Sequence, residues 1–323
     1  KSNRSCEAVF QAVHMIQDIY PHKLNNHFDP EVHAGNEDIL LCITEGKILV
    51  QECRFKENEI VFPRVKDVSE IVFPGVKDVN KVAFPKVKDG ADSCMKSEGE
   101  KLRYLFSIDE TKYFLLDTML GSGEIPAGYA YVDERSLRKE GIGPDDHLFA
   151  AITGKHLADW YRDTRFCGRC GHRMIHSKKE RAMVCEACHY TAYPRIMPAV
   201  IVGVTNGDKL LITRYRTGFR YNALVAGFTE IGETMEETVQ REVMEEAGVR
   251  VKNIRYYKSQ PWGSANDILL GFYCDVDGDD RIYMDSQELK YAEWVHRNDI
   301  VLQPGEFSLT NEMMKRFKEG KEV

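Results

Sequence analysis

Short runs of alternating apolar and polar residues, bounded by turn formers, fill the stretch from residue 36 to residue 132. Clear examples lie at residues 39–43, 47–50 and 112–116. Alternation with a period of two places every second side chain on the same face of a strand, so each run predicts a half-buried strand. We therefore expect a β-rich N-terminal domain over residues 15–143.

A six-residue pattern, Phe-Pro-x-Val-Lys-Asp, recurs in this region with a period of 11 residues. Its three copies occupy residues 62–67, 73–78 and 84–89. Three copies of this length would form only a very small stack. A tandem duplication that lengthens a surface loop or a strand edge is the simpler interpretation, and a ligand-binding repeat is the alternative.

Two stronger patterns follow along the chain. A helix is predicted from about residue 144 to residue 165, because Leu148, Ile152, His156 and Trp160 recur there at four-residue spacing. Beyond Pro198, two apolar runs at 199–204 and 209–213 are separated by Asn-Gly-Asp. Asn-Gly favours the tight turn of a β-hairpin, so we expect a hairpin to open a C-terminal domain over residues 198–323.

The segment from Gly227 to Val249 combines helix signals with dense carboxylates. Thr234 followed by Glu237 is the pattern of a capping box, and Gly248 is typical of the residue just beyond a helix. These signals predict a helix over about residues 235–247. On it, Met235, Val239 and Val243 form an apolar stripe that is expected to pack inward.

Glu242 and Glu246 lie four residues apart and therefore on one face of this helix. Like charges at that spacing repel, so the pair indicates a bound cation, with a merely acidic surface helix as the alternative. Clustered carboxylate oxygens suit Mg²⁺ and Mn²⁺, which in turn suit a phosphate substrate. Arg241 lies four residues from both Glu237 and Glu245, and we expect it to hold a carboxylate in place.

Four cysteines are paired by spacing. Cys167 with Cys170, and Cys185 with Cys188, form two Cys-x-x-Cys pairs with fourteen residues between them. Two such pairs supply the four thiolates of a tetrahedral Zn²⁺, and a site closed by four sulfurs has no open position for a reacting water. We therefore predict a structural zinc ribbon, which with the preceding helix fills residues 144–197.

The ribbon is also rich in basic residues. A charged, solvated surface is the simpler interpretation, and a nucleic-acid-binding ribbon is the alternative. The residues concerned are Arg165, Arg169, Arg173, Lys178, Lys179 and Arg181.

Length and composition narrow the class of protein. A chain of 323 residues suggests two or three domains. The sequence has no run of 18 apolar residues, so no membrane span is expected. The net charge of −7 argues against strong nonspecific binding to nucleic acid. Nine cysteines without a secretory signal favour the reducing cytoplasm, and residues 1–14 are interpreted as an N-terminal extension.

The segment from Gly227 to Val249 resembles the Nudix box, G-x5-E-x7-R-E-U-x-E-E-x-G-U with U an aliphatic residue, and every fixed position is filled. The zinc ribbon before it resembles more narrowly the NADH pyrophosphatase (NAD⁺ diphosphatase) family, as do residues 193–195, 224–228 and 259–262. The resemblance implies an α+β protein. Its Nudix fold, a mixed β-sheet in an α/β/α sandwich, would be preceded by the zinc ribbon and the β-rich N-terminal domain.

The resemblance also implies site residues. Mg²⁺ or Mn²⁺ would be held by Glu242, Glu245, Glu246, Glu288 and the backbone carbonyl of Ala226. Catalysis is assigned to Glu242, Glu246 and Arg241, with Glu245 as the group that takes a proton from water. Contacts with the substrate are expected from Glu180, Tyr193, Phe228, Gln260, Pro261, Trp262, Asp267 and Thr310.

The reaction implied is hydrolysis of the pyrophosphate of NAD(H) to NMN(H) and AMP. Removal of NAD caps from RNA, and hydrolysis of another nucleoside diphosphate derivative such as ADP-ribose, are the alternatives. Because all box glutamates are present, a non-catalytic nucleotide sensor is disfavoured. A homodimer is expected. One stretch departs from the family: after Trp262 the chain continues Gly-Ser-Ala-Asn-Asp, where Pro-Phe-Pro-x-Ser is usual.

Overall fold

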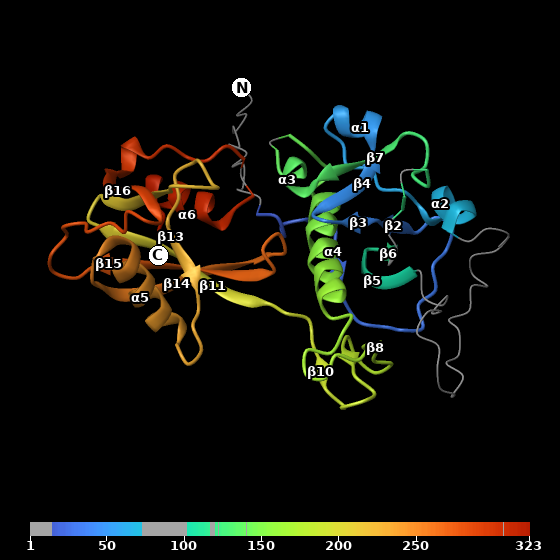
Figure 1. The fold of residues 1–323 in the computed structure, drawn as a ribbon. Coiled ribbons are helices and arrows are strands. Elements are labelled where there is room, and N and C mark those ends of the chain that lie inside the picture. Colours follow the sequence, from blue (N-terminus) through green and yellow to red (C-terminus); the bar gives the residue numbers. More distant parts are fainter. Residues whose placement is uncertain (1–14, 73–101, 117–119, 122, 140, 306) are drawn as a thin grey trace, which may run out of the picture. The chain divides into compact units, whose positions relative to one another are not determined.

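The computed structural model describes residues 15–72, 102–116, 120–121, 123–139, 141–305 and 307–323 (Figure 1). The predicted extension at 1–14 and the second and third copies of the repeat lie outside the described residues. The chain divides into two compact units. Of the described residues, the N-terminal unit contains those within 19–197 and 261–268, and the C-terminal unit contains those within 15–18, 198–260 and 269–323. Among the described residues, none of the helices combines the length and apolarity that a membrane span requires.

Among the described residues, the N-terminal unit contains two small β-sheets formed by the predicted runs. Their strands bury consecutive residues, so the predicted alternation of buried and exposed positions is not found. One sheet has the order β1-β5-β6-β2, with β2 parallel to β6, and the other has the order β3-β4-β7. Their strands are β1 (Leu24–Asn25), β2 (Ile39–Leu41), β3 (Ile43–Thr44), β4 (Lys47–Gln51), β5 (Leu102–Ile108), β6 (Thr111–Leu116) and β7 (Tyr129–Asp133). Leu40, Leu49 and Phe114 are almost completely buried in a common core. The β-rich character predicted for this region is confirmed.

In the part of this unit that the structure describes, the helices are α1 (Glu52–Lys56), α2 (Val65–Val72), α3 (Glu134–Leu137) and α4 (Asp145–Asp163). The helix predicted near 144–165 is therefore confirmed as α4. The first copy of the repeat runs along β2, because the Pro63 carbonyl accepts a hydrogen bond from the Leu40 N–H and Arg64 pairs with Ile39. Phe62 and Val65 of this copy are buried.

The remainder of the N-terminal unit includes a three-stranded ribbon of order β10-β9-β8. Its strands are β8 (Ile175–His176), β9 (Met183–Val184) and β10 (Thr191–Ala192). All three are only two residues long, so strand pairing alone gives this segment little stability.

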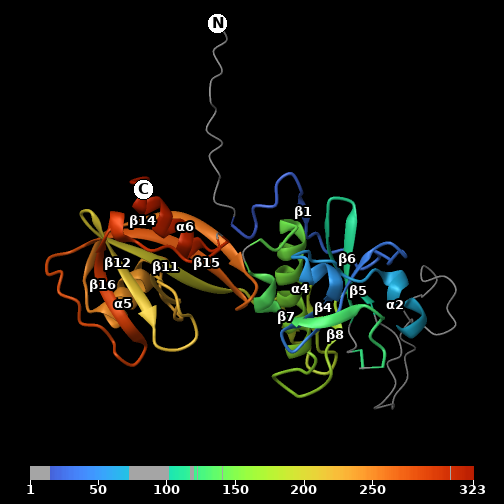
Figure 2. The same cartoon turned by 90° about the horizontal axis from the view of Figure 1, so that it is seen from above.

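The C-terminal unit is built on a six-stranded sheet of order β14-β15-β11-β12-β16, with β13 paired to β11 (Figure 2). The strands are β11 (Met197–Asn206), β12 (Lys209–Tyr215), β13 (Val225–Phe228), β14 (Val251–Trp262), β15 (Asp267–Val276) and β16 (Leu289–His296). The predicted hairpin is confirmed, since Asn206 pairs with Lys209 and Gly207 takes the positive φ of 58° that the turn requires.

Helices cover both faces of this sheet. They are α5 (Met235–Ala247) and α6 (Leu309–Lys318), and the short 3-10 helix η2 (Arg297–Asp299) precedes α6. Alternate residues of β11 and β12 belong to different cores: Val202 and Leu211 pack in the core that contains the apolar stripe of α5, and Ile201 and Ile212 pack in the core that contains α6. The period of two thus sends side chains to opposite faces, and the α/β/α sandwich is confirmed.

Candidate active site

Helix α5 begins and ends where the sequence predicts. The Thr234 hydroxyl accepts a hydrogen bond from the Glu237 N–H at 3.2 Å, and the Glu237 carboxylate accepts one from the Thr234 N–H at 2.7 Å. At the other end Gly248 has a φ of 67°, and its N–H donates to the Met244 carbonyl. The capping box and the glycine stop are confirmed, so the register of the glutamates along the helix is fixed.

The buried stripe of α5 also fixes the rotation of the helix. Val239 and Val243 are fully buried, which places Glu242 and Glu246 against strand β13. The Ala226 N–H donates to Glu246 Oε1 at 3.5 Å. Gly227 lies so close to Glu242 that a Cβ there would overlap the carboxylate. The structure therefore brings Ala226, Glu242 and Glu246 together, as the sequence analysis expects of metal ligands.

Arg241 connects the helix to the preceding loop and strand. Its guanidinium donates to Glu233 at 2.5 and 3.0 Å, to Glu242 at 2.7 Å, to Glu245 at 2.9 Å and to the Phe228 carbonyl at 2.8 Å. The hydrogen bond to Arg241 is the main reason why the pKa of Glu233 falls to about 2. The expected contact with Glu245 is confirmed. Glu233 takes the place expected of Glu237, whose carboxylate is used in the capping box.

Glu246 is the most unusual carboxylate of the group. It is only 2% exposed, and burial together with the neighbouring carboxylates raises its pKa to about 8. Its Oε2 atom is buried and has no hydrogen-bond partner among the described residues. A buried, unpaired carboxylate oxygen is costly unless a cation or donor compensates it, so this atom fits a metal ligand.

Two further residues surround the carboxylates. Tyr215, the last residue of β12, lies beside Glu246. Burial and the charges of Glu246, Glu242 and Glu288 raise the pKa of its hydroxyl. Glu288 is exposed and raises the pKa of both Glu242 and Glu246, and its backbone carbonyl accepts a hydrogen bond from the Arg216 N–H at 2.9 Å. Sequence reasoning missed Tyr215, whose position at the end of a strand carries no signal of its own.

The four paired cysteines converge in the N-terminal unit, where their ligand atoms all lie within 4.8 Å of one another. Sγ of Cys167 is 3.6 Å from that of Cys188, and Sγ of Cys170 is 3.4 Å from that of Cys185. Sulfurs at the vertices of a tetrahedron around zinc would be about 3.8 Å apart for a Zn–S bond of about 2.3 Å. The arrangement fits a zinc ribbon.

The two cysteine knuckles have the same backbone pattern. In the first, the Cys167 N–H donates to His172 and the Gly171 N–H donates to Cys167, both at 2.8 Å. In the second, the Cys185 N–H donates to Tyr190 and the His189 N–H to Cys185, again at 2.8 Å. Gly171 and His189 both have positive φ, at 76° and 58°. This equivalence explains how two separate loops present their sulfurs in the same way.

Of the expected substrate residues in the N-terminal unit, Tyr193 and Glu180 contact each other. Tyr193 is 57% exposed, and its hydroxyl donates to Glu180 at 3.0 Å. Pro261 is exposed, and Trp262 is half-buried with the Arg138 guanidinium 5.2 Å from its ring centroid. Asp267 is 5% exposed, and burial raises its pKa to about 6.

The expected substrate residues in the C-terminal unit differ in their surroundings. Phe228 is 50% exposed at the end of β13, next to the carboxylates. Gln260 is fully buried: its amide donates to the Phe307 carbonyl at 2.7 Å and accepts from the Leu309 N–H at 2.8 Å. These bonds hold the beginning of α6, where Thr310 lies half-buried. The structure thus places Phe228 at the site and uses the amide of Gln260 within the fold.

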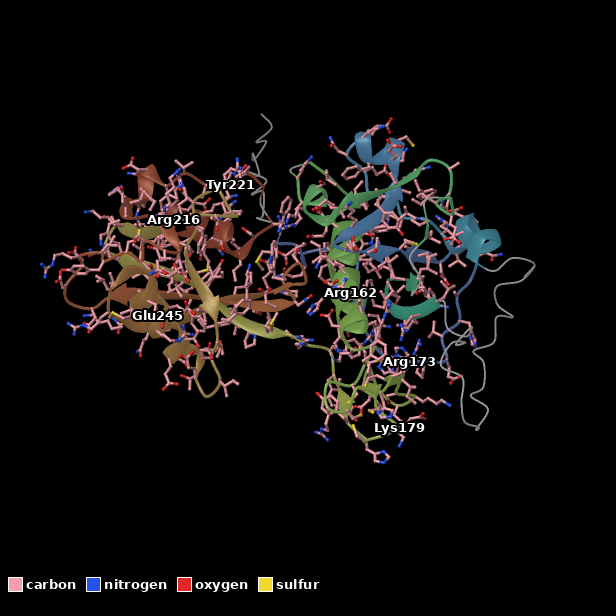
Figure 3. All side chains as sticks on the ribbon, in the orientation of Figure 1. Arg162, Arg173, Lys179, Arg216, Tyr221 and Glu245 are labelled. Atoms are coloured by element: carbon pink, nitrogen blue, oxygen red, sulfur yellow. The ribbon has the colours of Figure 1, made fainter. Side chains whose placement is uncertain are left out.

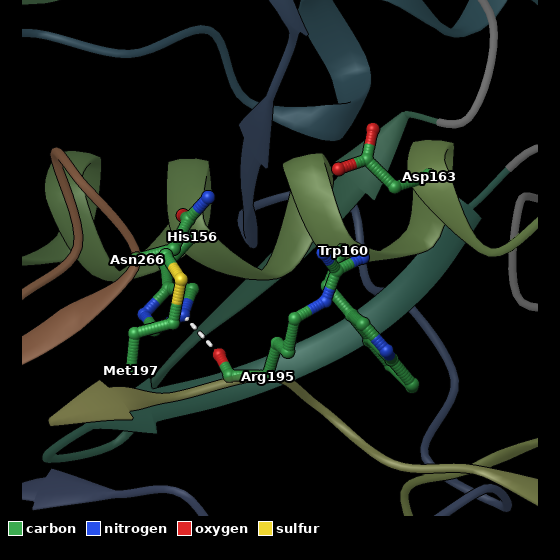
Figure 4. Close-up of a pocket in the computed structure, with 6 residues that line it drawn as sticks. All are labelled: His156, Trp160, Asp163, Arg195, Met197 and Asn266. Carbon is green, nitrogen blue, oxygen red and sulfur yellow. Dashed lines mark hydrogen bonds between the residues drawn. The ribbon is translucent and has the colours of Figure 1, made fainter. Parts of the chain in front are cut away.

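A separate pocket lies in the N-terminal unit (Figure 4). It is lined by His156, Trp160, Asp163, Arg195, Met197 and Asn266. His156 Nε2 lies 2.7 Å from the Arg195 carbonyl oxygen, while Trp160 Nε1 and Asn266 Oδ1 are buried without a hydrogen-bond partner in the described part of the chain. The pocket offers a donor and an acceptor to a small polar guest. Its single carboxylate, Asp163, does not provide the set that pyrophosphate chemistry needs.

Two known domain families match this chain. The NUDIX domain matches residues 195–317, and the NADH pyrophosphatase zinc ribbon domain matches residues 162–193. The NAD-capped RNA hydrolase NudC of Klebsiella pneumoniae is 44% identical over 176 residues, which cover 53% of this chain and 67% of the relative. The protein of the same name from Escherichia fergusonii is 44% identical over 167 residues, 50% of this chain and 64% of the relative.

Solved structures include a similar domain. A NUDIX hydrolase from Nitrosomonas europaea superposes with a TM-score of 0.43 at 22% sequence identity, covering 49% of this chain and 92% of that one.

Proposed function

This chain belongs to the NudC family of Nudix hydrolases, and on that premise we propose that it hydrolyses the pyrophosphate bond of NAD(H) to give NMN(H) and AMP. The observation that supports this reaction most directly is the buried Glu246 carboxylate with its unpaired oxygen, placed beside Glu242 and the backbone of Ala226. Clustered carboxylates of this kind suit Mg²⁺ or Mn²⁺, which suit a pyrophosphate.

In this proposal Glu242, Glu246, Glu288 and the carbonyl of Ala226 hold the metal ions, with Glu245 close by. When bound, the ions would neutralise the charge that develops on the pyrophosphate and acidify the attacking water. Arg241 keeps Glu242 and Glu245 in fixed positions through its hydrogen bonds to both. The attacking water forms the new P–O bond, the bridging P–O bond breaks, and Glu245 takes the proton that the water loses.

Removal of an NAD cap from RNA is the second candidate. It is supported by the similarity to the NAD-capped RNA hydrolases NudC and by cations on the zinc ribbon. Arg173, Lys178 and Lys179 of the ribbon are exposed. Arg173 and Lys179 are labelled in Figure 3. Exposed cations on a rigid surface suit a phosphate backbone. NMN release from NAD-capped RNA, compared with free NADH at rising salt, separates the two candidates: a steep loss with salt for the RNA alone supports cap removal.

Product analysis tests the main proposal. We expect the wild-type protein to release AMP and NMNH from NADH in Mg²⁺ or Mn²⁺, and the Glu246→Gln variant to be inactive. Glu236→Gln is the matched control, because Glu236 is an exposed glutamate in the first turn of the same helix. Equal inactivity of the wild-type protein and the Glu246 variant on NADH, ADP-ribose and diadenosine compounds would show that the chain is not this enzyme. Much faster cleavage of ADP-ribose would change the substrate and keep the chemistry.

The homodimer that the resemblance implies and the cytoplasmic location that the cysteine content favours remain proposals. Light scattering of the purified chain measures the first directly, and a mass of about one chain would contradict it.

A further inference from the structure

The loop that joins β12 to β13 exposes two aromatic rings. Phe219 is 44% exposed and Tyr221 is 49% exposed. Their ring centroids are 5.5 Å apart and their planes meet at 69°, which is an edge-to-face pair. The two rings therefore hold each other in place while large parts of both remain in contact with solvent. Paired, exposed rings of this kind are available to a planar ligand.

The base of this loop is anchored at the carboxylate site. Tyr215 precedes the loop and lies beside Glu246, and the next residue, Arg216, donates its backbone N–H to the carbonyl of Glu288 at 2.9 Å. The Arg216 guanidinium donates to the Ser286 carbonyl at 3.0 and 2.7 Å. The loop thus starts between two of the residues proposed to hold metal ions.

The far end of the loop is equally well defined. Arg214 donates to the Asn222 side chain at 2.7 Å, and Thr213 and Ala223 exchange two backbone hydrogen bonds, at 2.9 and 2.8 Å. The backbone hydrogen bonds between Thr213 and Ala223 close the loop in the manner of a β-hairpin. Phe219 and Tyr221 therefore project from a closed turn whose two ends are fixed in the sheet.

Strand β13 relates the loop to another exposed ring of the unit, Phe228. The loop ends just before the strand begins, and Phe228 is its last residue. Between these ends, Ala226 and Gly227 contact Glu246 and Glu242. At about 3.3 Å per residue, the extended backbone from Ala223 to Phe228 spans roughly 17 Å. Along the strand, the carboxylates thus lie between Phe228 and the loop.

A dinucleotide has the same arrangement, with a pyrophosphate in the middle and one nucleoside on each side. We propose that Phe219 and Tyr221 form a stacking subsite for the nucleobase that is not held at Phe228. This inference rests on the proposed function, since it needs a pyrophosphate at the carboxylates.

The expected effect is on binding. A stacked base contributes equally to the bound substrate and to the transition state, so its loss raises KM and leaves kcat nearly unchanged. Replacement of both rings, Phe219→Ala with Tyr221→Ala, is expected to raise KM for NADH about tenfold, within the range found for loss of base stacking. The value of kcat should stay within twofold.

Two variants serve as controls. Exchange of the rings, Phe219→Tyr with Tyr221→Phe, keeps two stacking surfaces and should retain the wild-type KM. Tyr256→Ala removes a ring that is 55% exposed on β14 and pairs with Phe272 at 5.7 Å, and it should also retain the wild-type KM.

The outcomes are distinct from those of the proposed function. If the wild-type protein cleaves NADH and the double alanine variant has an unchanged KM, or loses kcat to the same extent as kcat/KM, the subsite is wrong while the reaction stands. If the wild-type protein cleaves no dinucleotide, the proposed reaction fails. Titration with AMP and with NMN then tests the loop alone: tenfold weaker binding of one of them to the double variant supports the subsite, and equal binding of both overturns it.

Discussion

A glycine determines how closely strand β13 approaches helix α5. A Cβ at Gly227 would overlap the Glu242 carboxylate, so no larger residue fits without moving that carboxylate. We expect Gly227→Ala to displace Glu242 and to lower kcat on the order of 100-fold, since small misplacements of catalytic groups have effects of this size. The assay is NADH hydrolysis at saturating Mn²⁺. Gly123→Ala is the control, because a Cβ there meets no atom within 4 Å; similar activity of both variants would contradict the prediction.

Arg241 acts through the carboxylates that it holds. Its guanidinium makes five hydrogen bonds, to Glu233, Glu242, Glu245 and the Phe228 carbonyl, whereas a lysine ammonium has only three protons to donate. We expect Arg241→Lys to keep the positive charge and yet to lower activity about 10- to 100-fold, as is typical when a partner of metal ligands is altered. A titration of activity with Mn²⁺ should also show a lower apparent affinity for the metal. An unchanged titration curve would mean that the guanidinium has no role in positioning.

At this scale the sequence predicted more about α5 than about its surroundings. Glu242, Glu245 and Arg241 follow from helical spacing, which is a local property. The bond between Glu233 and Arg241 joins residues on a loop and a helix, and no spacing rule predicts it. Likewise, the burial of Gln260 depends on contacts with Phe307 and Leu309, more than 40 residues away.

Among the elements, α5 depends on its first turn. Thr234 and Glu237 satisfy each other's backbone N–H groups there, and Thr238 adds a bond to Glu233 at 3.0 Å. We expect Thr234→Ala to lower the free energy of unfolding of the C-terminal unit by about 1 kcal/mol. Urea denaturation, followed by a signal from that unit, measures the difference. Thr234→Ser keeps the accepting oxygen and should be neutral. Equal stability of all three proteins would show that the cap does not matter.

The start of β15 carries a pH-sensitive group. Burial raises the pKa of Asp267 to about 6 from an ordinary value near 3.8, and its Oδ1 atom has no hydrogen-bond partner among the described residues. The folded state therefore binds more protons than the unfolded state between these values, so this group stabilises the fold below about pH 4 and loses that contribution as pH rises through about 6. We expect Asp267→Asn to raise Tm at pH 7.

The control for Asp267 is the same comparison at low pH. At pH 4 the wild-type carboxyl is already neutral in the folded protein, so wild type and Asp267→Asn should melt at similar temperatures. A lower Tm of the variant at pH 7 would mean that the ionised carboxylate has a partner that stabilises it. Loss of NADH hydrolysis without loss of stability would instead support the substrate contact implied by the family resemblance.

Elements with strong local signals were predicted well, and short ones were not. Helix α4 has apolar residues at four-residue spacing, and α5 and the hairpin of β11 and β12 have cap or turn residues that mark their ends. Strand β13 has only four residues, and the ribbon strands have two each. They exist because partner strands or the cysteine cluster hold them, and such long-range pairing leaves no periodic pattern in the sequence.

For the whole molecule, two kinds of metal should have separable effects. The carboxylates of the C-terminal unit suit weakly held Mg²⁺ or Mn²⁺, whereas the four sulfurs of the N-terminal unit suit tightly held Zn²⁺. We expect dialysis against EDTA to abolish NADH hydrolysis while one zinc per chain remains by elemental analysis. Addition of Mn²⁺ should restore activity without refolding.

Loss of zinc should act on the ribbon, whose strands are too short to hold it together. Zinc bound by four thiolates contributes on the order of 10 kcal/mol to the folding of small domains, far more than these strands can supply. We expect Cys185→Ser to lose the zinc and to make residues 162–193 sensitive to protease, while Cys53→Ser, which changes an exposed cysteine outside the cluster, leaves both unchanged. A ribbon that resists protease without zinc would show that packing alone stabilises it, and the structural role of the metal would be wrong.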